Sequence, residues 1–597
     1  MRIRTFCKFV EVSELESMVL HDSTVVIDGQ NYYYNSYQES QLPFKLGCES
    51  HRYANYLREH LAMFKKANVK CYFIFKGGNE NMAKRLAKNK DLGIVSPAFM
   101  KSIYMEVLKE MDFKYVTCEY ESKRDIIELA QTLDCPVISY DVEFCFTGLR
   151  YIPRNELKFN ERDNTITCRY FSLDKFMRKY TLTAEKLALF IVLTDENIFP
   201  ENFFQEFFKR IRAPLGYFKR NLSLLYWVSK NNRNTTIKMV SQFVNAEDEN
   251  KFVEEVDKAQ LLIRRREKGG LSAACLLNPA AATVAPSDPN WFAKGVASNN
   301  IPINYVNLYR SKHFFGSMDV ELVDPIVSSL EIVKYAYDLL TDFQNDGFTL
   351  VYDTLSGQES MVVSELYSIR KPEYEASVCV FENGWDSVRE FALFEHFLKE
   401  TLQLASLQPL KKLPEGARLL VVALVYFSRK KSVDTSTEAT CVLLSYITLS
   451  LVLQKCGKNL PKFPFQSKPI LDSTTDESTV TDEDCNIAAA VLAEYLAVPE
   501  TAEQEAVDDD QVLYQLKEFQ ICLRQLNDLN LLCGAPLPPT VYSRVYSAAL
   551  VARLRVAAGS GDSQPFFRQT PGPGSDRLRL SKRSHRSLPG DVKRKQL

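Results

Sequence analysis

Short apolar runs alternate with helically spaced apolar positions over the first 200 residues. Three runs predict buried strands: Thr24–Asp28, Val69–Phe75 and Val137–Tyr140. Amphipathic segments between them predict helices: His51–Ala67, the basic Asn79–Asn89, Ala98–Met111 and Glu121–Leu133. Strands separated by helices are typical of an α/β fold, so we expect a parallel sheet covered by helices on both faces.

The pattern changes several times after this alternation. Arg150–Tyr170 predicts a β excursion, and Leu182–Thr194 predicts a further apolar helix. A second, mostly helical part follows, with possible strands at Phe348–Val351 and Leu419–Phe427. We therefore expect an α/β domain (1–200), a helical extension (201–268), a linker (269–301), a mostly helical second domain (302–462), an acidic segment with helices (463–558) and a disordered basic tail (559–597).

Composition adds little to this picture. Lys plus Arg number 74 against 75 for Asp plus Glu, so any nucleic-acid surface must be local. The sequence has 14 cysteines and no Cys-x-x-Cys motif. Their spacing favours free thiols in a reducing compartment over a disulfide framework. The N-terminus carries no apolar signal segment, and Leu419–Phe427 is far shorter than the ~20 residues that span a bilayer. We expect an intracellular protein with no membrane partner.

Four carboxylates mark the ends of the predicted strands and the start of a helix. Asp28 ends the first strand, Asp141 and Glu143 follow the third, and Glu121 begins the helix between them. If the chain stays extended after Tyr140, Asp141 and Glu143 point the same way. Clustered acids need a counter-charge, and Mg²⁺ or Mn²⁺ prefers oxygen ligands. The alternative is that each acid is a separate helix cap or surface group.

Several motifs carry a resemblance to a known family. They are Met-Arg-Ile-Arg-Thr-Phe at the N-terminus, Val-Ile-Asp-Gly, Phe-Lys-Gly-Gly, Glu-Ser-Lys-Arg-Asp, Cys-Pro-Val-Ile-Ser-Tyr-Asp-Val-Glu-Phe and Phe-Ser-Leu-Asp. These motifs resemble the asteroid family, a branch of the flap-endonuclease/XPG nucleases with a PIN-like fold. The resemblance is specific over about residues 1–230 and weaker afterwards. It implies a PIN-like nuclease domain over 1–200, Mg²⁺ or Mn²⁺ as the cofactor, and DNA as the partner.

The family's acidic positions are matched only in part. The resemblance carries four metal-binding acids onto Asp28, Glu121, Asp141 and Glu143. Two further acidic positions of the family hold Lys76 and Lys123 in this chain. The family's last acid falls at about Asn197, with Asp195 and Glu196 as neighbours.

Basic residues also enter through the resemblance. In the family, cations on the helix after the second strand reach the scissile phosphate, which implies this catalytic role for Lys84 and Arg85. The alternative is a solvated helix face.

These positions leave two functions open. We expect Lys76 and Lys123 to form internal ion pairs with Asp28, Asp141 or Glu121, which would neutralise part of the cluster without a metal. The first hypothesis is a structure-specific DNA endonuclease that acts on single-stranded, overhang or branched DNA. The second hypothesis is an inactive nuclease fold that binds nucleic acid or protein as a scaffold, with protein partners bound by residues 302–597. A nuclear or nucleocytoplasmic location is expected for either.

Overall fold

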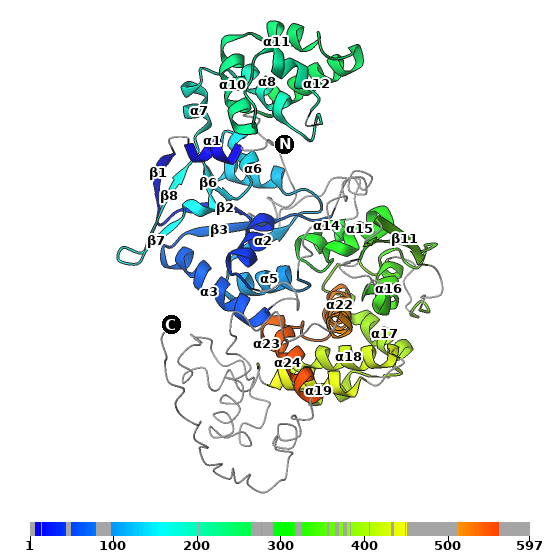
Figure 1. Cartoon of the computed structure of the whole chain (residues 1–597). Coiled ribbons are helices and arrows are strands. Elements are labelled where there is room, and N and C mark those ends of the chain that lie inside the picture. The colour runs from blue at the N-terminus through cyan, green and yellow to red at the C-terminus, as the bar shows by residue number, and fades with distance from the viewer. Residues whose placement is uncertain are drawn as a thin grey trace, which may run out of the picture.

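Figure 1 shows the computed structural model of the whole chain. The structure describes residues 6–12, 15–42, 49–78, 97–200, 202–263, 290–316, 325–354, 357–363, 369–373, 379–382, 384–404, 406–431, 435–447 and 510–559, together with Leu276 and Leu449. The basic helix predicted at Asn79–Asn89, most of the linker, the acidic segment around residues 463–509 and the basic tail lie outside these ranges.

A five-stranded parallel sheet forms the centre of the N-terminal part. Its strand order is β4-β3-β2-β5-β6, with every neighbouring pair parallel. The strands are β2 (Thr24–Asp28), β3 (Lys70–Phe75), β4 (Lys114–Thr117), β5 (Val137–Ser139) and β6 (Tyr151–Pro153). The carboxyl ends of parallel strands share one edge of the sheet, so Asp28, at the end of β2, lies on the same edge as the residue after β3, Lys76.

Alternating side chains supply the two cores on either face of the sheet. Val25 and Ile27 of β2 point into one core, and Val26 points into the other. The first face is covered by α2 (Gly29–Glu39), α3 (Ser50–Lys66) and α5 (Met100–Glu110), and the second by α1 (Phe6–Val12), α6 (Lys123–Thr132) and α8 (Ala184–Thr194). The predicted sheet covered on both faces is therefore confirmed.

The predicted β excursion is present as a small antiparallel sheet. Its order is β1-β8-β7, formed by β1 (Glu16–Leu20), β8 (Thr165–Tyr170) and β7 (Lys158–Asn160). A 3₁₀ turn, η2 (Arg154–Glu156), precedes β7. A helical extension follows and lies above the sheet in Figure 1: α7 (Leu173–Lys179), α9 (Gln205–Arg210), α10 (Tyr217–Lys230), α11 (Arg233–Val240) and α12 (Ala246–Leu262).

The second part is mostly helical, as predicted. Its helices are α14 (Asn290–Ala297), α15 (Ile303–Ser311), α16 (Leu330–Leu340), α17 (Leu393–Leu402), α18 (Glu415–Lys430), α19 (Ser436–Tyr446), α22 (Asp510–Leu532), α23 (Tyr542–Val545) and α24 (Ala548–Gly559). Three short 3₁₀ helices join them: η3 (Pro325–Ser329), η5 (Val388–Phe391) and η6 (Gln408–Lys412). The strand predicted at Phe348–Val351 is confirmed within a sheet of β9 (His313–Phe315), β10 (Phe348–Thr354) and β11 (Gly357–Val363).

One predicted strand is wrong. Leu419–Phe427 lies inside α18, with Glu415 in the first turn and Arg429 and Lys430 in the last. These charges complement the helix dipole, and the buried positions recur at helical spacing. The valines in this run favour strands in isolation, but tertiary packing of a long apolar face outweighs that preference.

The second part shares one of the two hydrophobic cores with the helices that cover the first face of the sheet. Leu57 of α3 and Tyr104 of α5 belong to the same cluster of buried side chains as Leu523 of α22 and Tyr542 of α23. Figure 1 shows α22 and α23 between the helices of the sheet and those of the second part. The predicted domain boundaries at residues 200 and 302 stay predictions. The shared cluster of buried side chains contains residues from both parts of the chain. No helix among the described residues has the length and apolar character needed to cross a membrane.

Candidate functional site

Asp28 is a buried carboxylate whose oxygens are occupied by neighbouring donors. It ends β2 and caps α2, where it accepts hydrogen bonds from the Asn31 amide nitrogen (3.3 Å) and from Asn31 Nδ2 (2.7 Å). Ser139 Oγ, at the end of β5, donates to Asp28 Oδ2 over 2.8 Å. Burial raises the pKa of Asp28, and the bonds from Asn31 and Ser139 oppose that rise. No lysine among the residues that the structure describes pairs with Asp28.

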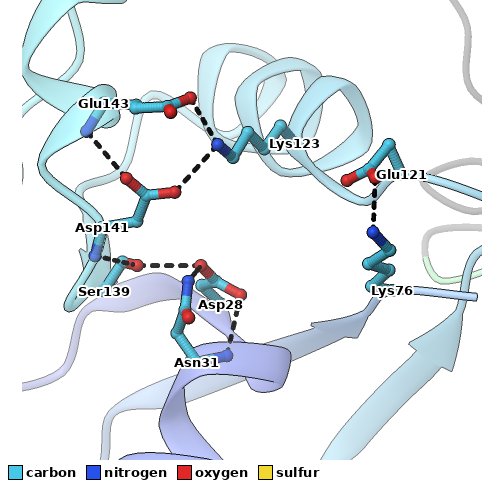
Figure 2. Close-up of polar contacts among 8 residues, drawn as sticks. All are labelled: Asp28, Asn31, Lys76, Glu121, Lys123, Ser139, Asp141 and Glu143. Atoms are coloured by element: carbon cyan, nitrogen blue, oxygen red, sulfur yellow. Dashed lines mark hydrogen bonds and ion pairs between the residues drawn. The ribbon is translucent and has the colours of Figure 1, made fainter. Parts of the chain in front are cut away.

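Lys123 lies between Asp141 and Glu143 (Figure 2). Its ammonium is 2.9 Å from Asp141 Oδ2 and also contacts Glu143 Oε2. Burial would lower the pKa of Lys123, but the two carboxylates outweigh it and raise the pKa above its ordinary value. The ammonium therefore stays charged and supplies the positive charge that the two acids need.

The backbone reaches this arrangement by a route that differs from the predicted one. The extended course expected after Tyr140 is wrong, because β5 ends at Ser139 and a 3₁₀ helix, η1, covers Val142–Phe146. Asp141 caps η1 by accepting from the Glu143 amide over 3.0 Å. The two carboxylates nevertheless converge, because both reach the same ammonium.

Lys76 and Glu121 form a second ion pair on the same edge of the sheet. Lys76 Nζ is 2.5 Å from Glu121 Oε1, and both side chains are partly exposed. Glu121 was predicted to begin the helix, but α6 begins at Lys123 and Ser122 is its N-cap. The Glu121 carboxylate contacts Lys76 instead. The expected pairing of the two lysines with the acidic cluster is thus present, with Glu121 and Asp141 as partners and not Asp28.

The remaining predicted residues lie elsewhere. Asp195 is buried at the C-cap of α8, and the Asn197 amide donates to its Oδ1 over 2.9 Å. These residues form a local turn. Lys84 and Arg85 fall outside the described residues, so their catalytic role stays a prediction.

A divalent metal does not fit this arrangement. The ammonium of Lys123 already lies between two of the predicted ligands, and the oxygens of Asp28 accept from Asn31 and Ser139. Across the ranges that the structure describes, no three His, Cys, Asp or Glu side chains are grouped in a way that could hold a metal ion.

Three further side chains at this edge of the sheet were not predicted from the sequence. Asn31 and Ser139 hold Asp28, yet only the three-residue spacing from Asp28 to Asn31 hints at a cap. Lys101 of α5 lies over the Phe75 ring, with Nζ 3.5 Å from the Lys76 carbonyl oxygen. Burial lowers the pKa of Lys101 to about 7.

Gly77 makes the turn beside Lys76 possible. A Cβ at this position would lie 1.9 Å from the Cys118 carbonyl oxygen and 2.3 Å from that of Glu119. We expect Gly77→Ala to lower the free energy of unfolding by about 2 kcal/mol, because backbone atoms must move to make room. Chemical denaturation measures this change.

A helical glycine supplies the control for that substitution. At Gly416 of α18, the nearest atoms would lie 3.7 Å from an added Cβ. Gly416→Ala is expected to raise the free energy of unfolding by up to about 1 kcal/mol. Equal effects of the two substitutions would contradict the close contact at Gly77.

Comparisons with known proteins relate this chain to one family. The family model described as the asteroid N-terminal domain matches residues 416–557. The single-strand DNA endonuclease ASTE1 of Homo sapiens is 27% identical over 264 residues, which cover 38% of this chain and 39% of that protein. The protein of the same name in Pongo abelii matches to the same extent. The chain thus spans about 39% of the length of these relatives.

More distant similarities were also found. Protein asteroid of Drosophila melanogaster is 23% identical over 150 residues, which cover 22% of this chain and 17% of that protein. The solved structure of human GEN1 with Holliday junction DNA aligns over 69% of this chain and 99% of that chain, with 10% identity and a TM-score of 0.30. The sequence matches show that this chain is similar to proteins of the asteroid family, the family that its motifs resemble.

Proposed function

We propose that this chain is a nuclease-like protein that binds single-stranded or branched DNA without metal-dependent cleavage. The observation that carries the proposal is the position of Lys123, whose ammonium bridges Asp141 and Glu143. A fixed ammonium at this point repels a divalent cation, by several kcal/mol on the Coulomb scale at short range. The lysines also reduce the negative charge of the edge, so a phosphate backbone meets less repulsion there.

Support for DNA as the partner comes from the relatives. The human and orangutan relatives carry the name single-strand DNA endonuclease, and they match 38% of this chain. Phosphate contacts position a strand without reading its sequence, so we expect binding to depend on salt and little on base sequence. Protein partners through residues 302–597 and a nuclear location stay predictions.

The second candidate function is metal-dependent endonuclease activity. It is favoured by one observation, the presence of Asp28, Asp141 and Glu143 near the same edge of the sheet. In that case a divalent metal would have to displace Lys123 from the two carboxylates.

Cleavage and binding assays on the full chain separate the two candidates. End-labelled single-stranded, 3′-overhang and flap DNA are incubated with Mg²⁺ or Mn²⁺, and gel shifts are run in EDTA. We expect no cleavage and a salt-sensitive shift that EDTA leaves unchanged. Asp141→Ala tests the site, with Asp163→Ala as a control at an acid outside it.

The outcomes decide between the functions. Cleavage that disappears in Asp141→Ala and persists in Asp163→Ala would establish the endonuclease and overturn the proposal. The absence of both cleavage and a gel shift would overturn DNA binding itself.

A further inference from the structure

A helix of the second part packs directly on the turn that carries Lys76. Gly78, two residues after Lys76, lies so close to α15 that an added Cβ would be 2.8 Å from Asn307 Oδ1 and 2.9 Å from Val306 Cγ1. The Val306 and Asn307 side chains are buried. Figure 1 shows α14 and α15 beside the sheet. The second part therefore touches the edge of the sheet at a glycine that leaves no room for a side chain.

An ion pair holds the same helix on the segment that follows β4. Three residues after Asn307, Arg310 Nε donates to Glu119 Oε1 over 2.7 Å, and the two residues are 191 positions apart in sequence. The Arg310 guanidinium also lies over the Phe292 ring of α14, 4.7 Å from its centroid. The Arg310 and Glu119 side chains are 23% and 20% exposed, so solvent screens this pair less than a fully exposed one.

Backbone hydrogen bonds join the two segments that α15 contacts. The Gly77 amide donates to the Tyr120 carbonyl oxygen over 2.8 Å, and the Gly78 amide donates to the Glu119 carbonyl oxygen over 2.7 Å. The turn after β3 and the segment after β4 therefore form one unit, and α15 packs on both halves of it.

The second part also reaches this turn through α5. In the first turn of α5, Lys101 Nζ lies 3.5 Å from the Lys76 carbonyl oxygen. Further along the helix, Glu106 accepts from the amide of Tyr542, at the start of α23, over 2.8 Å. The Phe99 ring, at the N-cap of α5, stacks on the Tyr542 ring with centroids 4.1 Å apart. The turn that carries Lys76 thus lies between α15 and a helix that α23 holds.

The ion pair between Lys76 and Glu121 is too exposed to fix this turn by itself. The two side chains are 29% and 57% exposed, and an exposed ion pair is weakened by solvent screening and by the loss of side-chain entropy. The position of the Lys76 ammonium therefore depends on the backbone that α15 holds. Lys76 supplies a cation to the acidic edge, by which we mean the sheet edge that carries Glu121, Asp141 and Glu143.

We propose that Arg310 and Glu119 are positioning residues, through which α15 of the second part holds Lys76 where it meets the phosphate backbone of DNA. This inference rests on the proposed DNA binding, and it gives a helix of the second part a role in the DNA-binding surface. Arg310 and Glu119 act through Lys76 and need no contact with DNA of their own.

The sign of the effect of Glu119 distinguishes positioning from simple charge. Glu119→Gln removes a negative charge, so charge alone predicts tighter binding of DNA. Loss of the correct position of Lys76 predicts weaker binding instead. We expect Glu119→Gln and Arg310→Ala each to lower the affinity of the full chain for single-stranded DNA about fivefold, the effect of roughly one exposed ionic contact. Fluorescence anisotropy with a labelled oligonucleotide measures the affinity.

A matched control removes the same charge elsewhere. Asp257 pairs with Arg233 over 2.6 Å in the helical extension. Asp257→Asn breaks that pair, and DNA binding should not weaken. Unchanged or tighter binding in Glu119→Gln, or an equal loss in Asp257→Asn, would overturn the positioning role.

A double-mutant cycle shows whether Arg310 acts through Lys76. In a chain that already carries Lys76→Ala, the substitution Arg310→Ala should have no further effect on DNA affinity. Losses that add would overturn the proposal, because Arg310 would then act on DNA independently of Lys76.

Hydrogen exchange separates this inference from the DNA binding on which it rests. In Arg310→Ala, the amides of Gly77 and Gly78 should exchange about tenfold faster, while peptides of α12 keep the wild-type rate. Unchanged exchange in the folded variant would overturn the proposal whatever the DNA result, and Glu119→Gln serves the same test if Arg310→Ala does not fold. If the wild-type chain fails to bind DNA, the proposed function and the DNA role of Arg310 are both overturned, whereas faster exchange would still show that α15 holds the turn.

Discussion

Replacing Lys76 and Lys123 together with aspartate is expected to raise the affinity of the chain for Mn²⁺ by at least about 100-fold. The substitution removes the ammonium between Asp141 and Glu143 and frees Glu121 from its ion pair. An ammonium ~4 Å from a bound cation opposes it by a few kcal/mol at an effective dielectric of ~20, and every 1.4 kcal/mol is tenfold in affinity. Isothermal titration calorimetry with Mn²⁺ measures the change.

A charge-matched double variant separates this effect from net charge. Lys158 begins β7 and Lys238 lies in α11, and both are exposed. Lys158→Asp with Lys238→Asp makes the same change in charge outside the acidic edge, so Mn²⁺ affinity should stay at the wild-type level. Equal gains in the two double variants would show that overall charge, and not the position of the lysines, limits metal binding.

Truncating Tyr542 to alanine is expected to lower the free energy of unfolding by about 3–5 kcal/mol. The side chain is 1% exposed and stacks on Phe99, so its removal leaves a cavity between two parts of the chain. Urea denaturation followed by circular dichroism measures the loss. Tyr226→Ala, at a side chain that is 51% exposed, provides the control and should cost about 1 kcal/mol or less. Similar losses in both variants would contradict the importance of the packing between Tyr542 and Phe99.

Local patterns in the sequence predicted much of the sheet and its acidic edge. The run that ends at Asp28 is a strand because its apolar side chains alternate between two buried faces. The ion pairs of Lys76 and Lys123 were expected from the family resemblance, which places both lysines at acidic positions, since opposite charges at one edge of a sheet attract. Such inferences succeed because they depend on neighbours in sequence or on strand ends that parallel topology brings together.

The features that the sequence did not reveal depend on distant partners. Glu106 and Tyr542 carry no local signal of their contact, because neither a helix period nor a turn residue encodes a partner 436 positions away. The assignment of Leu419–Phe427 as a strand failed for a related reason. A run of valine and leucine is ambiguous until its packing partners are known, and here those partners are helices.

The long separation between α5 and α23 has a consequence for synthesis on the ribosome. The helices that cover one face of the sheet are made first, but their partner at Tyr542 follows Glu106 by 436 residues. At roughly 5–20 residues per second, that interval is roughly 20–90 s. During this time Phe99 and its apolar neighbours have no partner from α23 to cover them. The nascent chain therefore presents a hydrophobic surface of the kind that chaperones bind, until its last helices emerge and complete the core.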